Sequence, residues 1–134
     1  DIISGRGIVD LYSHLAIKTS SKRDHKKGVE IKNKIVKSAE MVTTYCKNDE
    51  LCDLTLKEFT KYYARFVRDS ALHLIPHKIY LTGGISPFIK NYIKKYFIKE
   101  FVRHRSYTDL LKKIGVYVII NSDVGLLGAG SLVQ

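Results

Sequence analysis

The stretch HKIYLTGGISP, residues 77–87, constrains the fold more than any other part of this chain. Residues 78–82 are mostly apolar and predict a short buried strand. Two glycines then predict a tight turn, and Ser86 followed by Pro87 predicts the cap and first position of a helix. Such a passage lets a ligand approach bare backbone and points the amide N–H groups and the dipole of the helix at the same place. On spacing alone, however, an ordinary tight turn is the simpler interpretation.

A second strand is predicted at VYVII, residues 116–120, which is apolar on both faces as an interior strand requires. Asp123 follows it and could cap a last helix over residues 124–133. Together these segments describe a βαβα unit. A right-handed crossover would make the strands parallel and bring the two glycine-containing turns, at Gly83 and at Gly125, to one crevice. This joint geometry makes nucleotide binding as good an interpretation as an ordinary turn.

Amphipathic helices are predicted around this unit. The first follows the turn SGRG at residues 4–7, and the second spans residues 29–45. The fourth runs from Pro87 to about Lys95, with Phe97 and Phe101 placed in a less regular region, and residues 108–113 form a further helical turn or two.

The third helix is the longest, from a capping box at residues 55–58 to Pro76. Its apolar stripe at helical spacing could be mistaken for a platform on which bases stack, but the spacing favours a core role. The stripe consists of Phe59, Tyr62, Tyr63, Phe66, Val67, Ala71 and Leu74.

The composition fits one domain over residues 1–134, with 45% hydrophobic residues. A formal charge of +10 raises the question of nucleic acid or anionic membrane. The basic residues are dispersed and no nucleic-acid-binding motif accompanies them, so a solvated surface is favoured; residues 18–28 are expected to form an exposed basic loop. No signal peptide or apolar run of membrane-spanning length is visible, which predicts a soluble, cytoplasmic protein without a membrane partner.

The residues that could catalyse a reaction or bind a metal do not form a recognisable catalytic or metal-binding pattern. Cys46 and Cys52 are expected to be free thiols, with a disulfide left open for an oxidising compartment, and His73 and His77 do not complete a zinc site. No metal site is therefore predicted. The carboxylates of the predicted helices are expected to be solvated or capping charges; they are Asp10, Asp69 and Asp109.

Four motifs in this order, SGRG, LTGGISP, VYVII and GLLGAG, resemble the C-terminal part of the bacterial-type glucokinase family. That family belongs to the actin, hexokinase and Hsp70 superfamily, and the resemblance covers essentially the whole chain. It implies an α/β fold: a partial actin-like (ribonuclease H-like) lobe, with a βαβα core of two main parallel strands and additional amphipathic helices. The GLLGAG stretch would be the closing helix of that lobe.

The resemblance also implies a site. It places Thr82, Gly83, Gly84 and Ile85 beside the adenosine of ATP, which would bind with Mg²⁺. The phosphate loops, the general base and the glucose-binding residues of the family would all lie upstream of Asp1. The complete enzyme would convert ATP and glucose to glucose 6-phosphate in glycolysis, whereas this segment would supply no catalytic residue and be inactive alone.

Two positions depart from the family pattern: Phe88 stands where a basic residue is frequent, and Gly115 where proline is frequent. An alternative function is a non-catalytic module derived from the same lobe that binds nucleotide or a protein partner, and exposed helix faces could support a homodimer. A basic nucleic-acid-binding domain is the third and least favoured interpretation.

Overall fold

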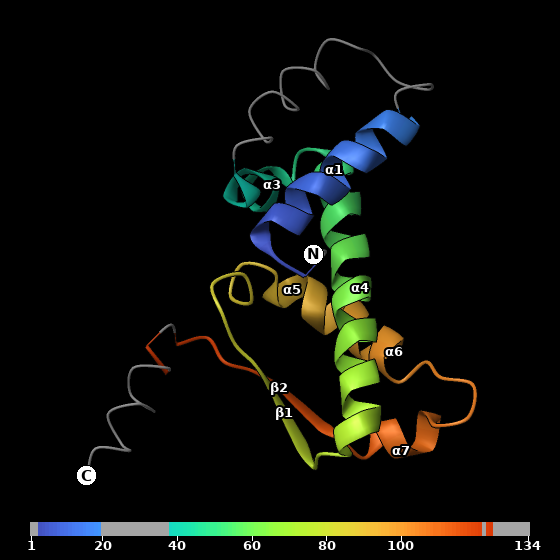
Figure 1. The fold of residues 1–134 in the computed structure, drawn as a ribbon. Coiled ribbons are helices and arrows are strands. Elements are labelled where there is room, and N and C mark those ends of the chain that lie inside the picture. The colour runs from blue at the N-terminus through green and yellow to red at the C-terminus, as the bar shows by residue number, and fades with distance from the viewer. Residues whose placement is uncertain (1–2, 20–37, 122, 125–134) are drawn as a thin grey trace.

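The computed structural model describes residues 3–19, 38–121 and 123–124. Over these residues, helices gather around the long helix α4, and two strands form one sheet beside it (Figure 1). The fold is therefore α/β, as predicted, and over these residues it is mostly helical. The elements are α1 (Gly5–Thr19), α3 (Ala39–Tyr45), α4 (Glu50–Leu74), β1 (Lys78–Leu81), α5 (Lys90–Tyr92), the π-helix η1 (Ile93–Phe97), α6 (Ile98–Phe101), α7 (Thr108–Lys112) and β2 (Gly115–Val118).

Helix α4 begins at Glu50, five residues before the predicted capping box, so that prediction is wrong. Asp49 is the N-cap: it is extended, and its Oδ1 accepts a hydrogen bond from the Cys52 amide at 2.7 Å. Thr55 lies buried inside the helix, where its hydroxyl donates to the Leu51 carbonyl at 2.6 Å. The helix is therefore capped by Asp49, which lies just before the first apolar residues of the helix, and not by Thr55 of the predicted capping box.

The predicted apolar stripe of α4 is only partly buried. Phe59, Val67 and Ala71 belong to the core, and Tyr63 packs against it. In contrast, Tyr62, Phe66 and Leu74 are exposed, which corrects the prediction for these three side chains. The stripe is wider than the surface that the neighbouring elements cover, because α1 and α3 pack near the start of the helix and η1 and α6 near its middle (Figure 1).

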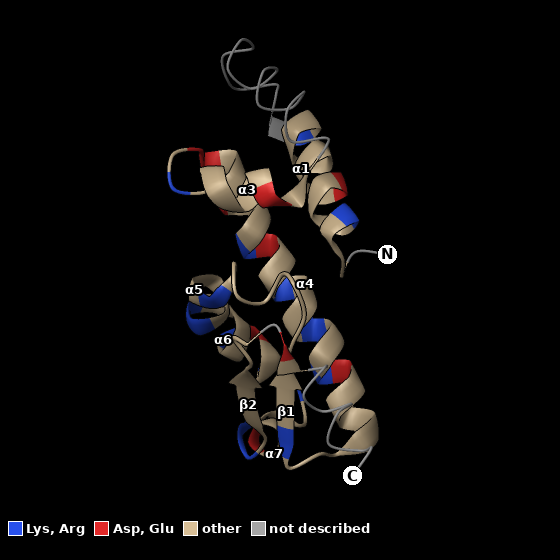
Figure 2. Ribbon diagram, turned by 90° about the vertical axis from the view of Figure 1, so that its left-hand side faces the viewer, with Lys and Arg blue, Asp and Glu red and all other residues tan. Residues whose placement is uncertain are grey.

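Strands β1 and β2 pair in parallel, as predicted, and their arrows point the same way in Figure 2. Ile79 and Leu81 of β1 pack against the core together with the β2 residues opposite them. On the other face, the rings of Tyr80 and Tyr117 stack with centroids 5.4 Å apart, and both are exposed. Within the described residues each strand has one partner. The second strand was predicted to lie in the interior of a sheet, but among these residues β2 is an edge strand.

The helix after the glycines starts at Lys90, not at Pro87, and continues through η1 to Phe101. Residues 84–89 are turns, in which the Ile85 carbonyl accepts from the Phe88 and Ile89 amides at 3.0 and 3.3 Å. The predicted helix start and the predicted irregular region near Phe97 are both wrong.

The π-helix η1 explains how this helix stays regular on its buried side. Ile89, Ile93, Phe97 and Phe101 are all buried and recur every four residues. A four-residue repeat drifts around an α-helix of 3.6 residues per turn, and the wider π turn offsets that drift. The helix therefore keeps one continuous apolar face against α4.

Several predictions fall partly outside the described residues. Of the helix predicted over 29–45, residues 39–45 are seen as α3, and of the loop predicted over 18–28, Lys18 lies in the last turn of α1. The last predicted helix, with its GLLGAG stretch, lies outside except for Val124. The first helix was predicted to follow a turn at residues 4–7, but it begins at Gly5, and Ser4 caps it because the Ser4 Oγ accepts from the Gly7 amide at 3.0 Å. None of the described helices has the length and apolar character needed to cross a membrane.

Candidate functional site

The turn that follows β1 presents bare backbone to open space. Gly83 has a φ of 116°, a conformation that favours glycine, and the Ser86 amide donates to its carbonyl at 3.2 Å. Among the described residues, and apart from each glycine's own chain neighbours, a Cβ placed on Gly83 or on Gly84 would find no atom within 4 Å. In the part of the chain that the structure describes, a ligand can therefore approach the main chain at these two glycines without meeting a side chain from another element.

Side chains on either end anchor this turn. Thr82 is exposed, whereas Ile85 is half-buried and packs against the core. Ser86 is 3% exposed, and its hydroxyl donates to the Thr82 carbonyl at 3.4 Å. The four predicted site residues are thus one short turn with an open side at residues 82–84 and a fixed side at Ile85.

Tyr63 of α4 contacts the turn at Ser86, and the sequence prediction missed this contact. Burial raises the pKa of its phenol, and a hydrogen bond with Ser86 partly opposes that shift. Its ring meets the Phe97 ring edge-on, with centroids 5.5 Å apart. The predicted core role of this tyrosine is the only sequence signal that pointed to it, because the pairing with Ser86 joins segments far apart in the chain.

The end of β2 lies beside the end of β1. The Ile119 amide donates to the Leu81 carbonyl at 2.9 Å, one step beyond the paired strands. Farther along, the Asp123 amide donates to Oδ1 of Asn121 at 2.9 Å, and Ile120 is exposed. Both strands therefore end at one edge of the sheet, as predicted, while the glycine turn expected at Gly125 lies outside the described residues.

One part of the predicted site geometry is wrong. The sequence suggested that a helix opening at Pro87 would aim its N-terminal amides at the glycine turn. The helix instead opens at Lys90, after the turns of residues 84–89. What the structure offers at the turn is open backbone, and the helix begins three residues later than predicted.

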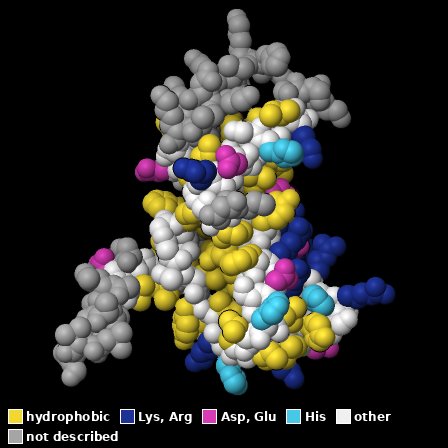
Figure 3. All heavy atoms as spheres, in the orientation of Figure 1, with side chains coloured by type: hydrophobic (Ala, Val, Ile, Leu, Met, Phe, Trp, Pro, Cys, Tyr) yellow, Lys and Arg dark blue, Asp and Glu magenta, His cyan; other side chains and the backbone are white. Residues whose placement is uncertain are grey.

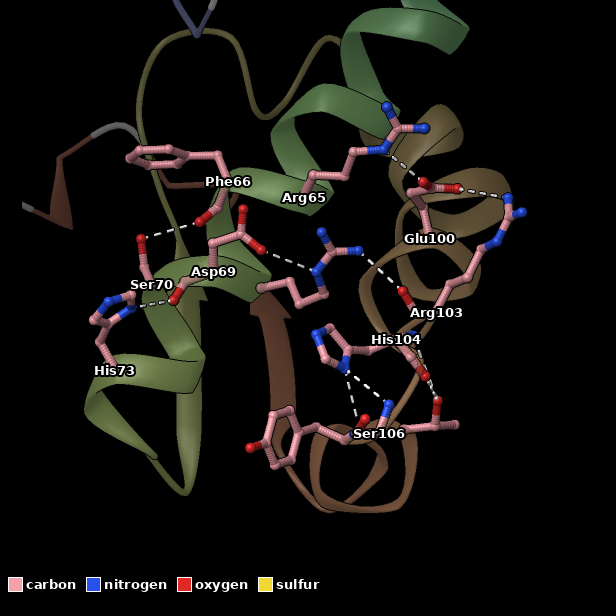
Figure 4. Close-up of polar contacts among 12 residues, drawn as sticks. Arg65, Phe66, Asp69, Ser70, His73, Glu100, Arg103, His104 and Ser106 are labelled. Atoms are coloured by element: carbon pink, nitrogen blue, oxygen red, sulfur yellow. Dashed lines mark hydrogen bonds and ion pairs between the residues drawn. The ribbon is translucent and has the colours of Figure 1, made fainter.

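The predicted surface carboxylates are exposed on helices, as expected. Asp69 pairs with Arg68 at 3.0 Å, and Asp109 pairs with Lys112 at 3.4 Å. His73 contacts the Asp69 carbonyl through Nδ1 at 2.7 Å (Figure 4). In the part of the chain that the structure describes, no group of three or more His, Cys, Asp or Glu residues could hold a metal ion.

A group of polar side chains, buried at Tyr12 and Cys52 and exposed at Asp53, joins α1, α4 and α5 and was not foreseen. The Tyr92 hydroxyl donates to Oδ1 of Asp53 at 2.6 Å, and Cys52 lies beside the Asp49 cap. Burial raises the pKa of Tyr12, Cys52 and Tyr92 well above their ordinary values, with Asp49 adding to the first two shifts. These groups are therefore held neutral, and both cysteines are free thiols, as predicted.

Gly115, one of the two departures from the family pattern, has a local explanation. A Cβ at this position would lie 2.9 Å from Cε2 of Tyr117, so any side chain there would displace the exposed tyrosine ring. Phe88, the other departure, is 62% exposed on the turn after the glycines. Nothing in the structure explains why phenylalanine stands there.

The chain is an α/β protein with a parallel strand pair and an open glycine turn at its carboxyl edge, which is the edge at which α/β sheets generally bind ligands. Within this class the family can be identified. The glucokinase family model matches residues 1–134, and the chain belongs to the glucokinase family. The resemblance seen in the four motifs is thereby confirmed.

Individual relatives agree with this identification. The glucokinase of Nostoc punctiforme is 30% identical over 141 residues, which cover 96% of this chain and 41% of that protein. The glucokinase of Photorhabdus laumondii is 28% identical over 99% of this chain and 39% of its own length. The glucokinase of Erwinia tasmaniensis is 30% identical over 97% of this chain and 38% of its own length. The chain thus spans about two fifths of the relatives it matches.

Proposed function

We propose that this chain is the C-terminal, nucleotide-side segment of a glucokinase-type sugar kinase, and that residues 82–85 form the wall against which adenosine binds. The observation that carries the proposal is the open backbone of Gly83 and Gly84 at the carboxyl edge of β1. Membership of the glucokinase family supports the choice of nucleotide as the ligand. In the complete protein, the γ-phosphate of ATP would pass to the 6-hydroxyl of glucose.

The chain's own contribution to this reaction is positioning. Phosphoryl transfer depends on aligned reactants and on charge stabilisation, and Mg²⁺ bound with the nucleotide would neutralise charge on its phosphates. Thr82 and the two glycines would contact the nucleoside, while Ile85 and Ser86 hold the turn in place. The general base, the phosphate loops and the glucose-binding residues would come from the rest of the protein, so the segment alone would be inactive.

Steady-state kinetics of the complete protein carrying Gly84→Val tests this proposal. A side chain in the open space should obstruct the nucleotide and raise the KM for ATP at least about tenfold, with the KM for glucose unchanged. Asn91→Val, at an exposed position on α5, is the matched control and should change neither KM. Equal effects on both substrates, or no effect of Gly84→Val, would refute the assigned role of the turn.

A non-catalytic module remains the second candidate, because the stacked pair Tyr80 and Tyr117 leaves an aromatic sheet face exposed. Such a face suits a protein partner or a second copy of the chain. Glucose-dependent ATP turnover by the complete protein would eliminate this candidate. A complete protein that binds nucleotide but does not phosphorylate glucose, and that sediments as a dimer, would favour it.

A further inference from the structure

Two rows of basic side chains lie next to each other on α4 and on the helix that packs against it. Each row has three residues spaced four apart, the spacing that places side chains on one face of a helix. We call the six residues the basic ladder: Lys57, Lys61 and Arg65 on α4, and Lys95, Lys99 and Arg103 along η1, α6 and the residues that follow.

Contacts between side chains bring the two rows together at both ends. At one end the ammonium groups of Lys57 and Lys95 lie 5.5 and 5.2 Å from the centroid of the Tyr96 ring. At the other end Arg65 and Arg103 converge on the Glu100 carboxylate at 2.6 and 3.9 Å (Figure 4). Since α4 rises about 1.5 Å per residue, the ladder extends for about 12 Å along the helix.

Few negative charges balance the ladder. Glu58 pairs with Lys61 at 2.6 Å, and Glu100 serves two of the arginines. Asp53 attracts Lys95 but already accepts the Tyr92 hydroxyl. Within the described residues, Lys57 and Lys99 form no ion pair, so the ladder keeps an excess of positive charge. Figure 3 shows basic side chains gathered along the edge of the molecule over α4 and α6.

We propose that the basic ladder binds the sugar–phosphate backbone of a nucleic acid, without sequence preference. Clustered ammonium groups on a rigid surface gain affinity by releasing counterions from phosphates. An anionic membrane is the less suitable partner, because a helix that lies in a membrane surface inserts a whole apolar face. On the helix from Lys90 to Phe101, Ile98 is the one large apolar side chain that is exposed, and the main apolar residues face the core. They are Ile93, Phe97 and Phe101. This binding would be independent of the nucleotide turn.

The test is fluorescence anisotropy of a labelled oligouridylate of about 20 nucleotides with the full chain, over a range of salt concentrations. If the four lysines of the ladder engage phosphates, the logarithm of the binding constant should fall with the logarithm of salt with a slope of about −3. Affinity should then fall about 50-fold between 50 and 200 mM salt.

Two variants of equal charge locate the surface. The ladder variant K57Q/K61Q/K95Q/K99Q should weaken binding at least about tenfold and flatten the salt slope. The control variant K47Q/K78Q/K112Q/K113Q removes four exposed lysines elsewhere and should bind nearly as the parent does. Circular dichroism and the urea midpoint check that both variants fold.

Three results would overturn the proposal. The first is an absence of RNA binding at 50 mM salt, where a negative salt slope means that binding should be stronger than at 200 mM. The second is an equal loss in both variants, which would mean that only net charge matters. The third is binding to vesicles of phosphatidylserine and phosphatidylcholine without binding to RNA, which would assign the ladder to a membrane surface.

Discussion

At the residue scale, the two adjacent glycines of the turn have different tasks. Gly83 adopts a φ of 116°, which side chains disfavour, whereas Gly84 does not lie in that region and faces equally open space. The sequence predicted the pair as a unit because two adjacent glycines indicate a turn but do not reveal which of them bears the unusual conformation.

Substitution of each glycine by alanine should separate these tasks. Gly83→Ala should lower the free energy of unfolding by about 1–3 kcal/mol, because alanine is strained at this φ. Gly84→Ala should change it by less than about 1 kcal/mol, since a methyl group there meets nothing. Urea denaturation of the two variants and the parent measures this, and equal losses would show that the φ of Gly83 is not what the turn depends on.

Ser86 and Tyr63 illustrate the limit of sequence reasoning at this scale. The glycines, Thr82 and Ile85 were predicted as neighbours because they are consecutive, and consecutive residues stay close in any fold. The pairing of Ser86 with Tyr63 depends on how α4 passes beneath the turn. Such a contact has no local signature, and therefore it emerged only from the structure.

At the element scale, two helix starts were predicted wrongly for the same reason. Thr55 and the Ser86–Pro87 pair both match start patterns, yet α4 begins at Glu50 and the later helix at Lys90. Start patterns report which residues can cap a helix. Where the helix opens depends on whether the preceding backbone is extended, as at Asp49, or is used in a turn, as at Ile85.

The Asp49 cap gives a direct prediction. Asp49→Ala removes the acceptor of the Cys52 amide and should cost about 1 kcal/mol of unfolding free energy. Glu58→Ala, in the segment predicted as a capping box, removes only a surface ion pair with Lys61 and should cost about 0.5 kcal/mol or less. If thermal or urea unfolding gave the larger loss for Glu58→Ala, the assigned helix start would be wrong.

The junction of α1 with α4 predicts how stability depends on pH. Tyr12 and Cys52 are fully buried, and burial raises the pKa of both groups in the folded state. As pH rises above about 9 to 10, the unfolded chain loses these protons while the folded chain keeps them. The unfolded state then binds fewer protons, so the free energy of unfolding should fall, by up to about 1.4 kcal/mol per pH unit for each group.

Tyr12→Phe tests this contribution. The Tyr12 hydroxyl is buried with no hydrogen-bond partner among the described residues, so its removal should leave stability at pH 7.5 unchanged or raise it by about 1 kcal/mol. The fall in stability above about pH 10 should become shallower. Urea unfolding from neutral to alkaline pH would detect the difference. Parallel curves for parent and variant would mean that Tyr12 does not titrate on unfolding.

At the scale of the whole molecule, the parallel strand pair and the family were predictable, because short apolar strands, glycine turns and motif order are properties of the sequence itself. The exposure of Tyr62, Phe66 and Leu74 on α4 was not, since a wide apolar stripe does not say how much of it the neighbours cover. The basic ladder likewise needed the structure, because its two rows come from segments far apart in the chain.

The central claim is that the glycine turn after β1 receives the nucleotide. It is tested most directly by titrating the full chain with ATP and ADP, with and without Mg²⁺, while following backbone amide shifts by NMR. The predicted result is a set of shifts centred on residues 82–85 that disappears in Gly84→Val and persists in Asn91→Val. No shifts at millimolar nucleotide, or shifts centred on the basic ladder instead, would contradict it.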